Sequence, residues 1–591
     1  MTRFAHVMGH NKTSRWPRYV TFYDVESEVS APINGKQFFT AFLWVACHVE
    51  YRKDSVDQHE VWESNSRPLA FWKTLEARTY DKSTRYVVSH HVEPDFIPLG
   101  GLTALPAQGW TLQHAYRKMA TVILRWSKST KRLVFINNAQ LLPGSIESWG
   151  KLLSLAKLPM PNKTDSAQAW NTYCKRDVEI MVEAWYKLKE FITEHDLGGF
   201  ALTRSGLAKH AFQHRFLTNT VYIHNNEDAI LLERRGYQGG RCEALQYGTF
   251  TNGPFYLLDV NGMYAHVEIE KLLPTKLLGV YDNPSLETVK RALINNGVIA
   301  DVMVELKEPI APVKTGVETT YYTDYVWTTL NTPELQYALG RGWDLEVRKM
   351  GVYTLRPLLR NFATYFAALK DKYATEGNGL FRELAKGYPN MVYGKFGQKG
   401  IEETIVGDCA PDLLWWMHGY DAVAQVNYDM LYSGGKIRRL ESTLAAWDTF
   451  VAVASHVTAY ARMYLWEIMK KAGLENVFHV ATDSVIVNQL GFDNLKDLLR
   501  PQQTGSLKME LKGKTLTVYG KNDWKLDHEV RVKGVGKKSK WLAEDKAINT
   551  VWPSLEGWLK GVYEGPYFVF DQVKTLKREE YHQCAQNQLI G

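Results

Sequence analysis

One stretch near the middle of the chain, residues 255–264, limits the possible folds more than any other. Its first half is an apolar run of strand character with Asp259 at its end. Its second half, from Asn261 onward, has the character of a turn that leads into a helix. A carboxylate where a buried strand meets a helix is well placed to hold a metal ion, and the N–H groups of a helix start favour phosphate. The alternative is an ordinary strand-to-helix junction whose aspartate caps the helix.

The composition indicates a multidomain protein with an anionic partner. The chain has 591 residues, more than one core usually holds, and 45% of them are hydrophobic. Its formal net charge of +7 suits a polyanion, although many unrelated proteins are equally basic. The five scattered cysteines form no C-x-x-C pair, which predicts a reducing compartment. No uninterrupted apolar run could cross a bilayer, so we expect no membrane partner.

The N-terminal part carries separated acidic residues that could share divalent cations. Asp24 and Glu26 form a D-x-E pair on a predicted strand, which places both carboxylates on one side. Asp95 follows another predicted strand, and Tyr173 and Asp177 lie at i and i+4 on one helix face. The alternative is that these acids are solvated loop residues. Their combination and order favour a nuclease-like metal site.

A glycine-rich junction precedes the central stretch. Tyr237, Gly239, Gly240 and Arg241 combine an aromatic ring, two glycines and a positive charge. Glycines let another backbone approach closely, and arginine binds phosphate with two hydrogen bonds. The alternative is a glycine turn with solvated arginines.

Residues 358–399 have the pattern of two helices around a turn at 376–379. The second helix places four polar or aromatic residues on one face, three or four apart: Arg382, Lys386, Asn390 and Tyr393. A lone basic stripe is usually a solvated helix face. Pro389 inside the same helix predicts a kink, because proline removes one backbone hydrogen bond.

The last strong motif is a predicted hairpin at residues 478–487. Two β-rich runs flank a tight turn that contains Thr482 and Asp483, and Ala481 precedes them. Asp259 and Asp483 could then meet on adjacent strands and hold two Mg²⁺ ions for phosphoryl transfer. Further on, Lys521 and Trp524 precede a basic run, which could also be a solvated loop.

Together these motifs, in this order, resemble family B DNA polymerases over nearly the whole chain. Asp259 begins a D-x-N-x-x-Y motif, Lys386 begins K-x-x-x-N-x-x-Y-G, and Tyr237 begins Y-x-G-G. The D-T-D-S motif of the family is present except that Ala481 replaces its first aspartate. The resemblance implies an α/β and α+β multidomain fold: an RNase H-like 3′–5′ exonuclease domain followed by a right-hand polymerase with palm, fingers and thumb. The compact length, the Y-x-G-G loop and the palm insertions resemble the protein-primed subgroup.

The resemblance also implies domain boundaries. We expect the exonuclease domain at 1–190, the junction and first part of the palm at 191–274, the palm with a first insertion at 275–357, the fingers at 358–399, a second insertion at 400–445, the second part of the palm at 446–525 and the thumb at 526–591.

Residue roles follow from the same resemblance. The exonuclease metals would be held by Asp24, Glu26, Asp95 and Asp177, with Tyr173 orienting the attacking water; the polymerase metals would be held by Asp259, Asp483 and the Val260 carbonyl. The incoming nucleotide would contact Val260, Asn261, Gly262, Met263, Tyr264, Arg382, Lys386, Asn390 and Tyr393. DNA would contact His91, Tyr237, Gly239, Gly240, Arg241, Thr482, Lys521, Trp524 and Lys533. His91 stands where the family usually has asparagine, and Tyr264 would exclude a 2′-hydroxyl.

The expected function is therefore template-directed DNA synthesis with proofreading. We expect a protein-primed, strand-displacing enzyme that replicates a linear phage or plasmid genome in the host cytoplasm. Its cofactor would be Mg²⁺, with Mn²⁺ able to substitute, and its partners DNA template and primer, dNTPs and a terminal protein. Two alternatives are a primer-independent polymerase of the same family and a degraded, non-catalytic DNA-binding relative, the latter because of Ala481 and His91.

Overall fold

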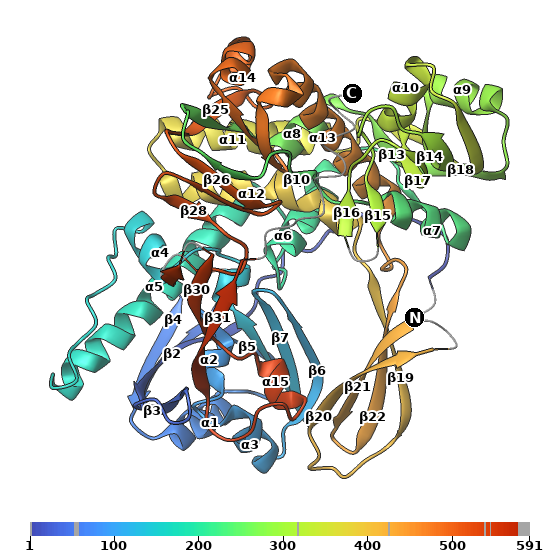
Figure 1. Ribbon diagram of the computed structural model, residues 1–591. Helices are drawn as coiled ribbons and strands as arrows, with labels where there is room; N and C mark the ends of the chain where they lie inside the picture. The colour runs from blue at the N-terminus through green and yellow to red at the C-terminus, as the bar shows by residue number, and fades with distance from the viewer. Residues whose placement is uncertain are drawn as a thin grey trace.

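The computed structural model describes residues 3–51, 58–315, 318–422, 426–536, 539–543 and 545–576. Figure 1 shows an N-terminal unit built on a large sheet, a second unit of sheets and helices above it, and a separate ribbon of strands beside the first unit. Within the described residues, no helix is both long and apolar enough to span a bilayer.

The N-terminal unit is a mixed sheet whose centre is parallel. The central strand β2 (Tyr19–Val29) pairs in parallel with β5 (Thr84–Ser89), which pairs in parallel with β8 (Lys131–Asn137). The outer strands are antiparallel: β3 (Lys36–Glu50), β4 (His59–Asn65), β6 (Thr111–Lys118) and β7 (Thr121–Lys128). Helix α5 (Ala167–Glu194), capped at its start by the Ser166 side chain, packs against β2 and β3. This arrangement fits the predicted exonuclease domain, although α5 runs past the predicted boundary at residue 190.

The C-terminal strands extend this same sheet. Strand β31 (Phe568–Thr575) pairs antiparallel with β3, and β30 (Lys546–Val551) and β29 (Lys540–Ala543) continue outward. The helix α15 (Leu555–Leu559) buries its two leucines in the core of the N-terminal unit. The predicted thumb at 526–591 is therefore not a separate unit in its described part, and residues 577–591 lie outside the described residues. The boundary at 526 also divides a meander, because β26 (Leu516–Gly520) pairs with β27 (Asp523–Leu526) and β27 pairs with β28 (Glu529–Arg531).

The palm is a five-stranded sheet that brings together segments far apart in the chain. Its order is β10 (Cys242–Ala244), β23 (Val477–Ala481), β24 (Ser484–Asn488), β12 (Phe255–Val260) and β25 (Leu507–Gly513). Strand β12 is almost wholly buried because its apolar run lies between two neighbours. The predicted hairpin at 478–487 is confirmed, and it pairs Asp259 with Ser484.

Four helices support the palm sheet. Helix α13 (Val451–Ala472) is apolar and almost wholly buried. Helix α8 (Met263–Glu270) follows the positive φ of Gly262 directly after β12. The predicted helix pair is confirmed as α11 (Arg360–Thr375) and α12 (Gly379–Phe396), and α12 continues through Pro389.

The two predicted insertions are both small antiparallel sheets. The first contains β13 (Leu273–Asp282), β18 (Leu345–Arg356), β14 (Asn296–Glu305) and β17 (Tyr325–Asn331), with α9 (Leu286–Asn295), α10 (Thr332–Gly340) and the short pair β15 (Val313–Thr315) and β16 (Glu318–Thr320). The second is the separate ribbon of Figure 1: β19 (Gly400–Asp408), β22 (Lys436–Thr443), β21 (Val426–Ser433) and β20 (Trp415–Asp421).

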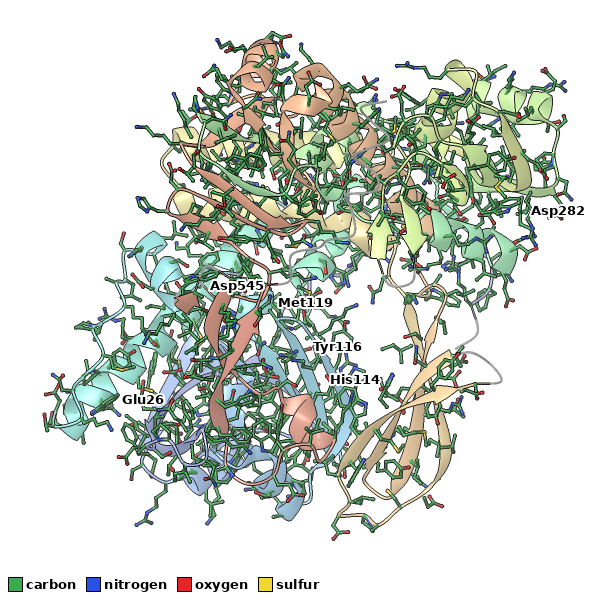
Figure 2. The ribbon with its side chains drawn as sticks, in the orientation of Figure 1. Glu26, His114, Tyr116, Met119, Asp282 and Asp545 are labelled. Carbon is green, nitrogen blue, oxygen red and sulfur yellow. The ribbon has the colours of Figure 1, made fainter. Side chains whose placement is uncertain are left out.

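The ribbon docks at its far end on the N-terminal sheet. Arg438 donates a hydrogen bond to Gln113 Oε1 at 3.2 Å, and Ser433 Oγ donates to the Leu112 carbonyl. At Gly434 a Cβ would lie 2.0 Å from Thr111 Cγ2, so the turn and β6 are in close contact. Figure 2 shows His114 and Tyr116 of β6 on the sheet edge that faces this ribbon. The chain thus forms a closed ring through the palm, the ribbon and the N-terminal unit.

A buried ion pair ties α13 to the first insertion. Arg462 Nη2 lies 2.7 Å from Glu334 Oε1, and both side chains are fully buried. Arg462 Nη1 also donates to the carbonyls of Gln238 and Gly239, at 3.0 and 3.1 Å. Arg462 therefore holds the backbone of the Y-x-G-G loop against α13.

We predict that Arg462→Leu strongly lowers the stability of the polymerase unit. Removing one partner of a buried pair leaves the other charge uncompensated, which typically costs about 3–5 kcal/mol. The measurement is the thermal midpoint of unfolding with and without the second substitution Glu334→Leu. The double variant should recover most of the loss, and a single variant with an unchanged midpoint would contradict the prediction.

Candidate active site

The palm sheet brings the two predicted catalytic aspartates together. Asp259 lies near the end of β12, and Asp483 lies in the turn between β23 and β24. The Val260 N–H donates to the Asp483 carbonyl at 2.8 Å, which fixes the turn against the strand. Burial and the nearby charge of Asp259 raise the pKa of Asp483 to about 6. Burial also raises the pKa of Asp259.

Two further charged residues that sequence reasoning missed face this pair. Lys508 Nζ on β25 lies 3.2 Å from Asp259 Oδ1 and 3.0 Å from Glu510 Oε1. The register of the sheet places Lys508 directly opposite Asp259. The only signal in the sequence is the K-x-E alternation in residues 508–510, which is too common to identify a site. Glu510 adds a third carboxylate, whose charge contributes to the raised pKa values of both aspartates.

The helix pair supplies positive charge opposite the aspartates. Arg382, Lys386 and Asn390 are exposed on one face of α12, as predicted. Lys370 of α11, which the sequence analysis did not select, donates to Asn261 Oδ1 at 3.2 Å. Burial, followed by the charges of Arg382 and Lys386 among others, lowers the pKa of Lys370, so these cations converge. Such a cluster can bind a polyphosphate.

Several residues predicted to contact the incoming nucleotide lie on α8 and α12, and two of them touch. The rings of Tyr264 and Tyr393 stack with centroids 4.5 Å apart, which joins α8 to α12. The prediction for the backbone needs one correction: the Asn261 N–H is already bonded to the Ser506 carbonyl at 2.9 Å. Gly262 and Met263 remain at the start of α8, where first-turn N–H groups lack intrahelical partners.

The Y-x-G-G loop lies against the catalytic turn. A Cβ on Gly240 would lie 2.8 Å from Thr482 Cγ2, and the Thr482 N–H donates to the Arg241 carbonyl at 2.7 Å. Gly240 is therefore required for the close approach of the loop to the turn that carries Asp483. Thr482 itself has a positive φ of 59°.

Two predicted DNA contacts are buried instead. Arg241 is 2% exposed, pairs with Glu243 and stacks on Tyr321 with its guanidinium carbon 4.4 Å from the ring centre. Trp524 is 4% exposed and belongs to the core of the β26–β28 meander. Sequence reasoning assigned both to DNA because arginine and tryptophan suit phosphate and bases, but here their side chains stabilise the fold. Lys533 and Gly239 are exposed, and His91 is exposed at the start of α2 (Val92–Phe96).

The four predicted exonuclease carboxylates also converge, in the N-terminal unit. Burial and the charge of Asp177 raise the pKa of Asp24 to about 7, and burial and the charge of Asp24 raise the pKa of Glu26 to about 8. Burial and the charge of Asp24 hold the pKa of Asp95 well above its usual range. Four acids with raised pKa values repel one another unless cations bind, and their carboxylate oxygens suit hard divalent ions.

Lys157 is a member of this site that sequence reasoning missed. Its ammonium forms an ion pair with Asp177 Oδ2 and lies 4.6 Å from the centre of the Tyr173 ring. It therefore connects the tyrosine and the aspartate that the sequence placed on one helix face. Lys157 comes from the connection before α5, where a single lysine carries no motif.

Asn137 and Asn138 both form hydrogen bonds with other parts of the N-terminal unit. Asn137 accepts a hydrogen bond from the Val92 N–H and donates to the Ala120 carbonyl, both at 2.7 Å. Asn138 Oδ1 accepts from the indole of Trp185 at 2.9 Å. These contacts hold α2, and with it Asp95, against the sheet.

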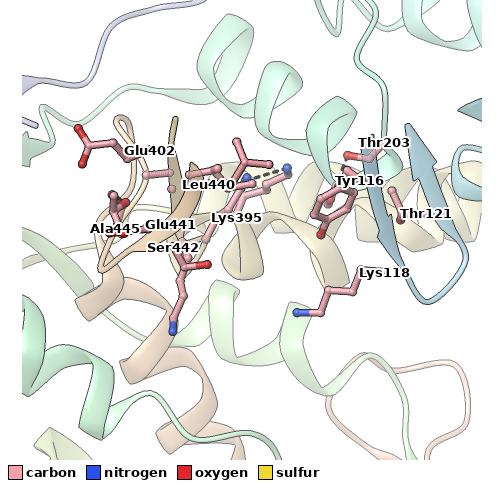
Figure 3. A pocket seen from close by; sticks show the side chains of 18 of the residues that line it. Tyr116, Lys118, Thr121, Thr203, Lys395, Glu402, Leu440, Glu441, Ser442 and Ala445 are labelled. Atoms are coloured by element: carbon pink, nitrogen blue, oxygen red, sulfur yellow. Dashed lines mark hydrogen bonds between the residues drawn. The ribbon is translucent and has the colours of Figure 1, made fainter. Parts of the chain in front are cut away.

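A cavity of about 1760 Å³ lies between the two units. Figure 3 shows Tyr116, Lys118 and Thr121 of the N-terminal unit on one side and Lys395, Glu402 and Leu440 of the polymerase unit on the other. Its lining contains more basic than acidic side chains; the basic ones are Arg3, Arg117, Lys118, Arg204, Arg234, Lys395, Lys399 and Lys560. A cavity of this size and charge can admit a nucleic-acid strand.

Comparison with known proteins agrees with this geometry. Residues 154–407 match the family described as DNA polymerase type B, organellar and viral. Over this stretch the chain is similar to the type B DNA polymerases. It is also similar to a DNA polymerase of Kluyveromyces lactis, with 22% identity over 406 residues, 61% of this chain and 38% of that protein. The chain thus spans well under half the length of this curated relative.

The fold itself matches solved DNA polymerase structures along nearly its whole length. The Phi29 DNA polymerase complexed with primer-template DNA and incoming nucleotide has a TM-score of 0.64 at 14% identity, covering 95% of this chain and 100% of that one. Its complex with single-stranded DNA has a TM-score of 0.65 at 15% identity, with the same coverage. The predicted multidomain α/β and α+β fold class is confirmed, although the described part of the predicted thumb joins the N-terminal sheet.

We predict that the two carboxylate clusters lose metal ions at different pH values. Protons compete with cations for carboxylates, so metal affinity falls as the pH is lowered through the raised pKa values. For the exonuclease cluster this range is about 8 to 7, and for the palm it lies near 6. The measurement is Mn²⁺ binding as a function of pH in Asp483→Asn, which isolates the first cluster, and in Asp24→Asn, which isolates the second. Equal pH midpoints in the two variants would contradict it.

Proposed function

We propose that the chain is a template-directed DNA polymerase with a 3′–5′ proofreading exonuclease. The observation that carries the proposal is the meeting of Asp259 and Asp483 at one end of the palm sheet, opposite the cations of α11 and α12. The second cluster in the N-terminal unit supports the exonuclease. The basic cavity between the units supports a path for DNA.

The residues of the palm have distinct tasks in this proposal. Mg²⁺ ions, for which Mn²⁺ can substitute chemically, would be held by Asp259, Asp483 and the Val260 carbonyl and would supply charge stabilisation for in-line phosphoryl transfer. Lys386 binds the triphosphate of the incoming dNTP, with Arg382 and Lys370 beside it. Tyr264 lies under the sugar, where its ring leaves no space for a 2′-hydroxyl, and its stacking on Tyr393 holds it in place.

The predicted exonuclease residues also have distinct roles in this proposal. Asp24, Glu26, Asp95 and Asp177 would hold the divalent ions, and Tyr173 orients the attacking water. Lys157 contacts both Tyr173 and Asp177, so it holds the tyrosine at the metal site. His91 contacts the primer strand at the exposed start of α2.

We further propose that synthesis is primed by a terminal protein and displaces the non-template strand. The support is the pair of insertions that flank the fingers, one of which closes a ring onto the N-terminal unit. Such an enzyme would replicate a linear phage or plasmid genome in the host cytoplasm. The discriminating experiment offers the protein an unprimed template with and without a candidate primer protein that bears a free Ser or Tyr hydroxyl. Covalent nucleotide transfer to that protein supports the proposal, and synthesis without it identifies a primer-independent polymerase.

We predict that Asp483→Ala abolishes extension of a primed template, whereas Ala481→Asp leaves it similar or raises it. Asp483 would bind the metal ions directly, whereas the residue at position 481 would lie next to the metal ligands without binding the ions. Loss of such a neighbouring residue typically lowers metal affinity or activity by about 10–100-fold. The measurement is primer extension by the variants across Mg²⁺ and Mn²⁺ concentrations. Asp24→Ala is the matched control, because it should lose strand degradation and keep extension. If wild type is inert and Ala481→Asp restores synthesis, the natural protein is a disabled relative and the main proposal fails.

We predict that opening the ring reduces strand displacement more than nucleotide addition. In Gly434→Val the new side chain collides with Thr111, and a positive φ of 59° disfavours it further, so the ribbon should undock. The measurement compares extension on single-stranded template with extension through downstream duplex. Arg439→Ala is the matched control, because Arg439 pairs with Asp421 and Glu441 within the ribbon. Equal losses in both assays would indicate damaged folding instead.

A further inference from the structure

A thiol lies inside the exonuclease cluster. Cys174 follows Tyr173 on α5 and is fully buried. Its Sγ lies 3.5 Å from Asp24 Oδ2 and 3.5 Å from the Asp24 carbonyl. The ligand atoms of Cys174, Asp24 and Glu26 all lie within 4.8 Å of one another. The cluster is therefore not made of oxygen ligands alone.

The spacing of these atoms suits a tetrahedral zinc site. Zinc binds thiolate sulfur at about 2.3 Å and carboxylate oxygen at about 2.0 Å, and a tetrahedral angle then puts the two ligand atoms about 3.5 Å apart. The observed Sγ to Oδ2 separation is 3.5 Å. A zinc ion could bind both atoms with little change in their separation.

Asp177 is a neighbour of this group, but it is not one of the three residues whose ligand atoms lie within 4.8 Å of one another. Its Oδ2 is held by Lys157, and its Oδ1 is buried and has no hydrogen-bond partner among the described residues. Two carboxylates and one thiol are a donor set that a thiophilic ion prefers over Mg²⁺.

We propose that this cluster binds Zn²⁺ with the Cys174 thiolate, Asp24 and Glu26 as ligands. The proposal rests on the proposed exonuclease function, because it makes the same site sensitive to a second metal. Zinc binding displaces the thiol proton to solvent. A zinc ion held in this way occupies Asp24 and Glu26, which the proposed exonuclease needs for its own divalent ions, so zinc occupancy stops strand degradation.

The test uses Co²⁺ as a spectroscopic substitute for Zn²⁺ in the full-length protein. Titration with Co²⁺ should produce a thiolate-to-cobalt charge-transfer band that added Zn²⁺ removes. Cys174→Ser should lack the band, and its Zn²⁺ affinity, measured by competition with a chromophoric chelator, should fall at least about tenfold. Cys47→Ser is the matched control: Cys47 is also buried beside a carboxylate, 3.9 Å from Glu60 Oε2, and its loss should leave the band unchanged.

The outcomes separate this inference from the function on which it rests. A wild-type protein without the band, or a band that persists in Cys174→Ser, overturns the zinc site. Mg²⁺-dependent degradation of single strands is measured on the same preparations. If the protein degrades single strands but shows no charge-transfer band, only the zinc site is refuted. If it shows the band but degrades nothing, only the exonuclease function is refuted. In Cys174→Ser, inhibition by Zn²⁺ should require at least about tenfold more zinc than in wild type. Serine differs from cysteine only in having oxygen in place of sulfur, and primer extension by each variant confirms that the protein is folded.

Discussion

The crowding of like-charged carboxylates in buried positions is the constraint on which the two sites depend. Burial and mutual repulsion raise the pKa values of Asp24, Glu26 and Asp483 to about 7, 8 and 6. Such clusters are unfavourable for an apo-protein and become favourable when divalent cations bind. The fold must therefore hold these groups together against their repulsion, which explains why each is anchored on a strand, a helix or a tight turn within a well-packed core.

Lysines reduce that repulsion in both sites. Lys157 pairs with Asp177 in the N-terminal unit, and Lys508 pairs with Asp259 in the palm. Each lysine comes from a segment other than the one that carries its aspartate, so the two segments are held together by the charge that they neutralise. Both lysines are partly exposed, which allows them to move when a cation or a phosphate takes their place.

The two units are joined by more than a linker. The chain leaves the N-terminal sheet, builds the palm and fingers, and returns to add β29–β31 to the same sheet. The ribbon β19–β22 makes a second connection through Arg438 and Ser433. The cavity between the two units has more basic than acidic side chains in its lining, which suits a polyanion.

Sequence alone predicted the residues whose role depends on short spacing. The D-x-E pair, the strand that ends at Asp259, the T-D turn and the helix face of Lys386 are periodic or local patterns, and the structure has them as expected. Sequence analysis could not identify Lys157, Lys508 or Lys370 as site residues, because a single lysine has no local sequence signature. Only folding brings Lys157 and Lys508 to an aspartate and Lys370 to Asn261. For the same reason sequence analysis assigned Arg241 and Trp524 to DNA: residue type sets what a side chain can bind, but only packing decides whether the side chain reaches solvent. The return of the C-terminal strands to the N-terminal sheet was also beyond local patterns, since strand pairing between β3 and β31 depends on hydrogen bonds between residues more than 500 positions apart.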